Sequence, residues 1–373
     1  MKKIKLIIPL LLILCLLSGC ISNVSNKNIS DENVAIDDNS EVTDNVINEN
    51  SLFEVHFIDV NQADAALVIS DHATMLIDGG NPKDSSKIVA YLKKLGISKL
   101  NYIVCTHAHK DHVGGLSGAL SYATVEKVFA PVTESDIDSY ISFKNKVVAQ
   151  GLTITNPTPG SSFELGSSVV QFLGPITENK SNINDTSIVL KISYGDTSFL
   201  FTGDAEREEE HENLYAGYDL NSTVLKVGHH GSENSTSYVF LREIMPEIAV
   251  ISVGKENSYG HPTEETLSRL RDADVKVYRT DMQGDIIISS NGKDVVVNTS
   301  KNKNANTIEV PTKVVQEDNG VVTKSNVYIG NIKSKKFHMP SCYSLPIEKN
   351  RIYLNSRTDA INNGFSPCGN CNP

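Results

Sequence analysis

Residues 52–300 alternate between short apolar runs and amphipathic stretches, which is typical of a protein that contains both strands and helices. Phe53–Phe57 changes between apolar and polar at every second position, as a half-buried strand does. Residues 85–95 have a helical period and stop at Gly96, a residue common just after helix ends. We expect further strands at 65–69, 74–77, 102–105, 169–173, 187–192, 198–201, 224–227, 248–253 and 285–288, and further helices at 135–149, 236–244 and 263–272. Interleaved elements of this length predict two sheets with helices packed outside them.

The rest of the 373-residue chain is more polar. Residues 21–51 are rich in Asn, Ser, Asp and Glu, so they cannot bury enough apolar surface to become ordered, and we interpret them as a tether. A second polar stretch is interpreted as a linker. The predicted division is a signal segment 1–20, the tether 21–51, a large domain 52–300, the linker 301–325 and a small module 326–373.

The first twenty residues have the order of an export signal: lysines, an apolar run at 6–17, then small residues before Cys20. An uncleaved helix or an ordinary secretory signal is the alternative. The small residues before Cys20 resemble a bacterial lipoprotein signal. That resemblance implies lipidation of Cys20 and attachment to the extracytoplasmic face of the cell membrane.

The strongest chemical signal directly follows the strand expected at 102–105. Its potential metal ligands are His107, His109, Asp111 and His112. The first two are two residues apart and point the same way, while the other two can turn toward a second point. Mixed imidazole and carboxylate ligands suit zinc, manganese or iron. A polar loop with coincidental histidines is the alternative.

Other strand ends carry further ligand types. Asp204 follows the strand at 198–201, and His229 and His230 follow the strand at 224–227. A single aspartate at a strand end is commonly a cap or a salt-bridge partner, but the repetition at three strand ends favours a metal site. Asp185 is a further candidate ligand, and its spacing alone also fits a turn residue.

The segment from His107 to His112 is the HxHxDH signature of the metallo-β-lactamase superfamily. The resemblance extends to the hydrolase-like domain of ComEC-type competence channels, through residues 57–60, 76–80, 201–205, 225–232 and 259–262. It covers about residues 52–290 and implies an α/β fold, the αββα sandwich of that superfamily. One departure is Asn61-Gln62-Ala63-Asp64, where the family has Gly-Gln-Gly-Asp.

The resemblance implies two divalent metals, zinc or manganese. His107 and His109 would bind one, Asp111 and His112 the other, and Asp204 would bridge them. One of His229 and His230 would complete the second site, and we favour His229. Many members use a third histidine for the first metal, and Asp185 stands in the corresponding stretch here. Asp78 would orient a ligand from outside the metal site.

The chemistry that this set implies is hydrolysis. Two cations would stabilise a hydroxide and the charge that develops when it attacks phosphorus or a carbonyl carbon. We place Asp111 and His261 among the catalytic residues, with His261 protonating the leaving group or holding a phosphate oxygen. A structural loop histidine is the alternative for His261.

The C-terminal module contains His338, Cys342, Cys368 and Cys371 in fewer than fifty residues. A unit of that size rarely folds on its apolar core alone, and these four side chains supply a structural zinc site. A disulfide, Cys368–Cys371 or Cys342–Cys368, is the alternative. Cys105 lies in an apolar strand and is expected to be a core residue.

This module also resembles the zinc domain of Ada-type DNA-repair proteins, through Phe337, Cys342, the Gly364-Phe365 pair and the Pro367-Cys368-x-x-Cys371 segment. In that family the first ligand is a methyl-accepting cysteine. His338 stands there in this chain, so we expect no alkyl transfer. Residues 324–373 carry seven Lys or Arg against two acids, which leaves binding to a DNA backbone possible beside a purely structural role.

Three functions follow from the sequence. The first is a membrane-anchored extracytoplasmic phosphodiesterase or nuclease that acts on DNA. The second is a hydrolase of cell-wall phosphodiesters, such as phosphorylcholine esters, or of lactones or lactams. The third is a non-catalytic DNA-binding lipoprotein. The net charge of −11 argues against indiscriminate nucleic-acid binding, and no protein partner follows from the sequence.

Overall fold

The computed structural model describes residues 53–177, 180–309, 328–340, 342, 344–354, 357–369, 371 and 373. The signal segment with Cys20, the tether 21–51 and residues 310–325 of the linker lie outside the described residues, and their boundaries stay predictions. Across the described ranges, no helix has both the length and the apolar character needed to span a membrane.

The first sheet of the large domain has the strand order β15-β14-β1-β2-β3-β4-β5-β6. Strands from β3 to β6 pair in parallel, and the others pair antiparallel. Their bounds are β1 Phe53–Phe57, β2 Ala66–Ser70, β3 Ala73–Ile77, β4 Lys99–Val104, β5 Thr124–Phe129, β6 Ile154–Thr155, β14 Ile286–Ser290 and β15 Val295–Thr299.

The second sheet has the order β13-β12-β11-β10-β9-β8-β7. Here β10 to β13 are parallel and β7 to β10 antiparallel. Their bounds are β7 Ser162–Leu165, β8 Ser168–Phe172, β9 Leu190–Tyr194, β10 Thr197–Phe201, β11 Val224–Lys226, β12 Ile248–Ile251 and β13 Lys276–Arg279. Both sheets therefore place a set of parallel strands where their carboxyl ends can meet.

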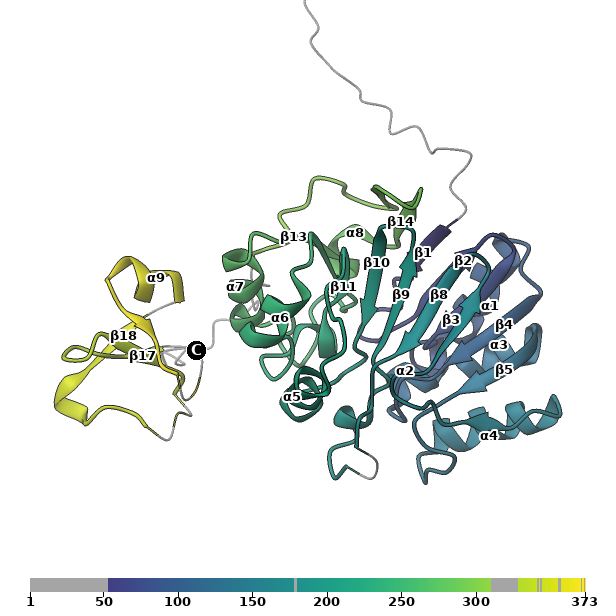
Figure 1. The fold of residues 1–373 in the computed structure, drawn as a ribbon, viewed down its shortest axis with the longest axis horizontal. Helices are drawn as coiled ribbons and strands as arrows, with labels where there is room; N and C mark the ends of the chain where they lie inside the picture. Colours follow the sequence, from purple (N-terminus) through teal and green to yellow (C-terminus); the bar gives the residue numbers. More distant parts are fainter. Residues whose placement is uncertain are drawn as a thin grey trace, which may run out of the picture. The chain divides into compact units, whose positions relative to one another are not determined.

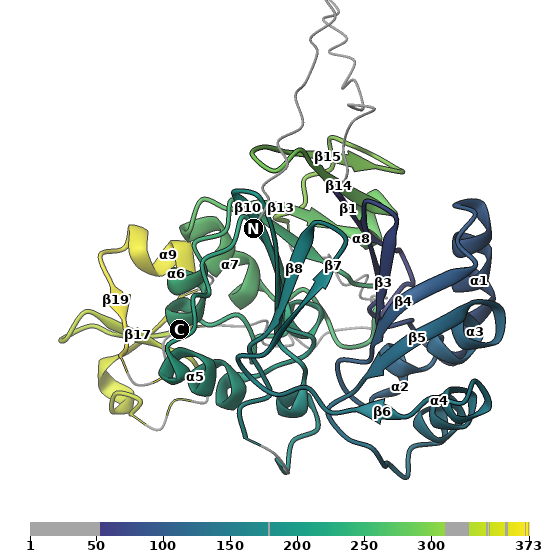
Figure 2. The ribbon, with the colours of Figure 1, turned by 45° about the vertical axis from the view of Figure 1, so that its right-hand side comes forward.

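Helices cover the outer face of each sheet (Figures 1 and 2). One apolar cluster lies between the sheets, a second lies under α1, α3 and α4, and a third lies under α6 and α7. This is the αββα sandwich that the sequence predicted. The helix bounds are α1 Ser85–Lys94, α2 Lys110–Val113, α3 Leu116–Tyr122, α4 Asp138–Ala149, α5 Arg207–Ala216, α6 Tyr238–Ile244, α7 Glu264–Asp272 and α8 Thr280–Gln283, with 3-10 turns η1 Pro82–Asp84, η2 Asn184–Thr186 and η3 Gly228–Gly231.

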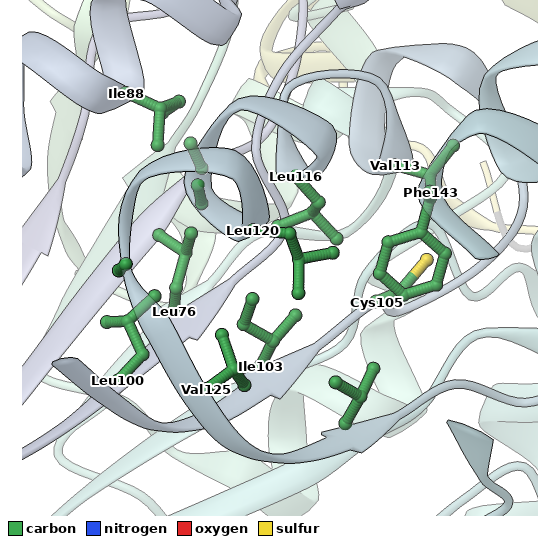
Figure 3. Packing of buried hydrophobic residues seen from close by; sticks show 14 of the residues in the cluster. Leu76, Ile88, Leu100, Ile103, Cys105, Val113, Leu116, Leu120, Val125 and Phe143 are labelled. Carbon is green, nitrogen blue, oxygen red and sulfur yellow. The ribbon is translucent and has the colours of Figure 1, made fainter. Parts of the chain in front are cut away.

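Cys105 lies in the cluster beneath α3 and α4, as the sequence predicted, and is fully buried. Figure 3 shows it beside Val113 and Phe143. Its backbone N–H donates to Phe129 O on the neighbouring strand at 2.9 Å. Apolar packing therefore fixes the end of β4 immediately before the histidines that follow.

Several elements escaped the sequence pattern. The acid-rich helix α5 has no clear apolar face, and its buried residues are Glu209, Glu210 and Asn213. The strand expected at 187–192 begins only at Leu190, and residues 187–189 between η2 and β9 are neither helix nor strand. The large domain also continues past residue 300, since Thr307 is buried and donates a hydrogen bond to Val277 O at 2.7 Å.

The C-terminal module has its own sheet, in the order β18-β16-β17-β19. Among its described residues, the apolar core consists of Tyr328, Phe337, Leu354, Ala360 and Phe365, with Met339 partly buried against it. So small a core agrees with the expectation that the module needs a further link. The bounds are β16 Tyr328–Asn331, β17 Lys336–His338, η4 Glu348–Asn350, β18 Arg351–Leu354, α9 Arg357–Asn362 and β19 Ser366–Pro367.

Candidate metal centres

Loops that follow strands of both sheets converge on one cluster of histidines and carboxylates. His107 and His112 follow β4 of the first sheet, while Asp204 and His230 follow β10 and β11 of the second. All four are buried. Since parallel strands present their carboxyl ends at the same sheet edge, the sandwich brings together side chains more than a hundred residues apart.

Asp204 lies at the centre of this cluster. Its Oδ2 is 3.2 Å from His112 Nε2 and 3.6 Å from His230 Nε2. The same oxygen is 3.8 Å from His107 Nε2 and 3.7 Å from His229 Nε2. One carboxylate oxygen therefore lies within 3.8 Å of four imidazole nitrogens.

The other side chains divide around Asp204. His107 Nε2 and His109 Nδ1 are 3.0 Å apart on one side. On the other side, Asp111, His112 and His230 form a group whose ligand atoms all lie within 4.8 Å of one another, and His230 Nε2 is 3.3 Å from Asp111 Oδ2. His107, His112 and Asp204 form a second such group.

Asp78 forms hydrogen bonds with the loop that follows β4. The resemblance implied that this residue orients a ligand from outside the metal site. Its Oδ2 accepts hydrogen bonds from His112 Nδ1 at 2.8 Å and from the Thr106 hydroxyl at 2.6 Å. Its Oδ1 accepts from the Thr106 backbone N–H at 2.8 Å. With Nδ1 donating, His112 presents Nε2 toward Asp204, the geometry of a histidine ligand oriented by a carboxylate.

The histidine pair in η3 occupies two different positions. Both residues have left-handed backbone, with φ of 47° at His229 and 53° at His230, so their rings diverge. His230 is buried, and its Nδ1 lies 2.9 Å from Ser252 O, which directs Nε2 at Asp111 and Asp204. His229 keeps 22% of its side chain exposed and has its Nδ1 3.1 Å from Glu206 Oε1. The geometry beside Asp111 and His112 thus favours His230, where the sequence led us to favour His229.

Asp185 has the position of a turn residue, the alternative that its spacing left open. Its Oδ1 accepts hydrogen bonds from the N–H groups of Glu206 and Glu209 at 2.8 and 3.3 Å, at the start of α5. Its Oδ2 accepts from Asn182 at 3.0 Å. Both oxygens are engaged in these contacts, and Asp185 is absent from the potential metal groups found among the described residues.

Two functional residues escaped the sequence analysis. Asp64, between β1 and β2, pairs its Oδ2 with Lys226 Nζ at 2.7 Å, and its Oδ1 lies 3.2 Å from His230 Nδ1. Both partners are buried. The sequence signal was available, because Lys226 is a charged residue inside the apolar run Val224–Val227, and a buried lysine requires a buried acid.

Burial and mutual charge set the protonation of the cluster. Burial opposes charge on every member, but Asp204 and Asp64 outweigh it at His230 and raise the pKa of its imidazole to about 10. At Asp64, burial is outweighed by Lys226 and His230, which lower the pKa of the carboxyl to about 2. Burial lowers the pKa of His107 well below its usual range. Neighbouring charges therefore dominate the pKa values of His230 and Asp64, whereas burial dominates that of His107.

The donor set fits divalent cations. His112 Nε2, His230 Nε2 and Asp204 Oδ1 are buried atoms for which the described residues provide no hydrogen-bond partner. Leaving three such atoms unmet is costly unless a ligand meets them. Imidazole nitrogens and carboxylate oxygens are the donors that zinc and manganese accept.

A cavity of about 360 Å³ opens over this cluster. His261 lines it, with its ring centroid 5.5 Å from that of His229. Burial and the neighbouring histidines lower the pKa of His261 to about 4. The lining residues are Gln62, His109, Lys110, Asp111, Ile137, Asp204, His229, His230, Tyr259 and His261.

The C-terminal module gathers a second, different set. One ligand atom from each of His338, Cys342, Cys368 and Cys371 lies within 4.8 Å of the others. Cys342 and Cys371 are not joined in disulfides, so neither pairing that the sequence left open is present. Burial and the two neighbouring thiols raise the pKa of Cys371 to about 12. Three thiols and an imidazole at one point are the ligands of a structural zinc site.

Comparison with known families agrees with both sites. Residues 58–255 match the family model described as the metallo-beta-lactamase superfamily. The chain belongs to the metallo-beta-lactamase superfamily. As a member of this superfamily it is a metal-dependent hydrolase. Residues 313–373 match the metal binding domain of Ada, which places a zinc-binding type of module after the metallo-beta-lactamase domain.

Relatives of this metallo-beta-lactamase domain occur in bacteria. ComE operon protein 3 of Bacillus subtilis is 31% identical over 62% of the chain and 32% of its own length. Competence protein ComA of Neisseria gonorrhoeae is 31% identical over 61% of the chain and 30% of its own length. The chain thus spans about a third of the length of these relatives. Among solved structures, the metallo-beta-lactamase fold protein YhfI from Bacillus subtilis aligns with a TM-score of 0.43 and 12% identity, covering 66% of this chain and all of that one.

Proposed function

We propose that this chain is a binuclear metal-dependent phosphodiesterase that hydrolyses DNA at the outer face of the cell membrane. The observation that carries the proposal is the position of Asp204, whose Oδ2 lies within 3.8 Å of imidazole nitrogens on both sides of the cluster. A shared carboxylate between two sets of ligands favours a two-metal site.

The residues of the cluster have separate roles in this proposal. His107 and His109 would hold one cation and Asp111, His112 and His230 would hold the other, with Asp204 available to both. Bound cations supply a deprotonated water and stabilise charge on a phosphoryl oxygen. Asp78 and Asp64 keep the Nε2 atoms of His112 and His230 directed at the cations, because each lies close to the opposite ring nitrogen.

His261 is proposed to act on the substrate. It lines the cavity and its Nδ1 is a buried atom for which the described residues offer no hydrogen-bond partner. Because the pKa of His261 is lowered, its ring is neutral at pH 7. In this proposal it therefore donates a hydrogen bond to a phosphate oxygen as a neutral imidazole and not as a positively charged group.

DNA is proposed as the substrate for two reasons. Relatives that share the large domain are named for competence and recombination, such as recombination protein 2 of Haemophilus influenzae, which is 29% identical. The cavity is also lined by the positively charged, exposed side chain of Lys110. A lysine beside a metal centre suits a phosphodiester substrate.

The test is hydrolysis by the full chain, purified in detergent and loaded with Mn²⁺ or Zn²⁺. Plasmid DNA and bis-p-nitrophenyl phosphate are assayed in parallel. We expect both to be cleaved, and His109→Ala to lower kcat/KM on both by roughly a thousandfold, the equivalent of several kcal/mol of transition-state stabilisation. The matched control is His72→Ala, which removes an exposed histidine outside the cluster and should leave both rates unchanged.

Cleavage of the small diester alone would contradict DNA as the substrate and favour another phosphodiester. Cleavage of neither substrate, with metal bound, would contradict phosphodiesterase activity altogether. Metal content by elemental analysis, two ions in the cluster and one zinc in the module, checks the proposed stoichiometry independently.

Membrane attachment is proposed to depend on lipidation of Cys20, which lies outside the described residues. We expect the chain produced in bacteria to partition into the detergent phase, and Cys20→Ser to move it to the aqueous phase. Detergent-phase partitioning of Cys20→Ser would show that another segment holds the membrane.

A further inference from the structure

Tyr259 is a solvent-exposed aromatic residue that lines the cavity over the Asp204 cluster. It is 68% exposed, and it lines the cavity together with Asp204 and His230. Its ring stacks on that of His261, with centroids 5.7 Å apart and planes at 27°. Tyr215 on α5 is even more exposed, at 79%, but is not part of the cavity lining. Position, rather than exposure, therefore distinguishes Tyr259.

The cavity offers three kinds of contact. Tyr259 comes from the loop after β12 of the second sheet and presents a flat π-face. Lys110 is the first residue of α2 and Ile137 directly precedes α4, both in the half that contains the first sheet, and they add an ammonium and an apolar group. A π-face and an apolar group suit a flat base, and the ammonium suits a phosphate. The candidate metal ligands His109, Asp111, Asp204 and His230 form another part of the lining.

We propose that Tyr259 stacks on a base next to the phosphodiester that is cleaved, so that the substrate is an unpaired DNA strand. This rests on the proposed function and narrows it. A base inside a duplex is already stacked on both faces, so it must leave the helix before it can reach this ring. The cavity volume of about 360 Å³ is near the lower end for ligand sites, about 300–1,000 Å³, and suits one nucleotide.

The test compares a short oligothymidylate with an abasic strand of the same length, both cleaved by the Mn²⁺-loaded full chain. We expect Tyr259→Ala to raise KM for the oligothymidylate about tenfold and to leave kcat unchanged, because one base–aromatic contact is lost. KM for the abasic strand should not change. Tyr259→Phe keeps the ring and should behave as the unaltered chain, as should the control Tyr215→Ala.

Each outcome decides a different point. If Tyr259→Ala raises KM for both strands equally, or for neither, the base contact is contradicted while nuclease activity stands. If duplex DNA of the same sequence is cleaved as well as the single strand, the restriction to unpaired strands is overturned. If the unaltered chain cleaves neither strand, the proposed function fails and this inference fails with it.

Discussion

The two metal centres of this chain differ in how much of their geometry exists before a metal binds. The Asp204 cluster lies at the ends of strands from two sheets, in a domain that is packed around three apolar clusters. The carboxylate of Asp78 already orients His112 through a hydrogen bond. Among the described residues of the module, the apolar cluster consists of five buried side chains, and the His338 and cysteine set lies in the same small unit. We therefore expect the first site to be formed before cations bind, and the second to depend on its cation for folding.

The ligand chemistry follows the same division. Imidazoles and carboxylates around an open cavity leave room for a substrate, while three thiols and one imidazole close a tetrahedral site. We therefore expect the large domain to stay folded when a chelator removes the metal ions, and to lose only its activity. The module should lose its structure.

Among the substitutions that test this comparison, Cys368→Ser is expected to have the largest effect. A structural zinc site contributes on the order of 10 kcal/mol to the folding of a small unit, so removal of one thiolate should unfold the module. Limited proteolysis should then cleave residues 328–373 and leave a resistant fragment that contains residues 53–309. The matched control is Cys105→Ser in the core of the large domain, which should leave the module resistant. A resistant module in Cys368→Ser would show that its apolar core suffices.

Lys226→Met tests whether the large-domain cluster is preformed. It leaves the buried Asp64 carboxylate without its 2.7 Å cation partner, which should lower the free energy of unfolding by about 3–5 kcal/mol. Urea unfolding of the metal-free protein measures this loss. Asp64→Asn combined with Lys226→Met should recover most of it, because neither member of the pair then carries a charge that lacks its partner. Equal stability of the single and the double variant would contradict the pairing.

The same pair makes a pH prediction with a defined sign. The folded pKa of Asp64, about 2, is below its ordinary value of 3.8. The contribution of the pair is therefore complete above pH ~4 and is lost as the pH falls toward 2. This acid loss should be absent from the double variant.

Asp185→Asn is expected to have the smallest effect. It weakens a carboxylate cap on the N-terminus of α5, which should lower the free energy of unfolding by about 0.5–1 kcal/mol. The metal content of the Asp204 cluster should not change, because Asp185 oxygens face backbone N–H groups. Loss of a metal ion from this variant would restore Asp185 as a ligand.

Local spacing carried the sequence analysis furthest. His107, His109, Asp111 and His112 lie within six residues, so their convergence needs only one loop. Asp204 was found because it follows an apolar strand. By contrast, Asp64 and His230 are 166 positions apart, and no local pattern joins them.

The choice within the histidine pair shows the same limit. His229 and His230 are adjacent and identical in type, so the sequence cannot separate them. Their left-handed backbone turns one ring into the buried cluster and the other toward Glu206. That turn depends on how η3 packs against β12, where Ser252 O meets His230 Nδ1.

The sequence by itself determined the sandwich architecture, the strand-end histidines, the strand-end carboxylate Asp204 and the second ligand set in the C-terminal module. These follow from apolar periodicity and from short ligand spacings, which act over a few residues. Tertiary structure alone decided which histidine lies beside Asp111, that Asp185 caps α5, and that Lys226 and Asp64 pair beneath the site. Those outcomes depend on burial and on charges brought together from distant segments, because a side chain's direction is set by what packs against it.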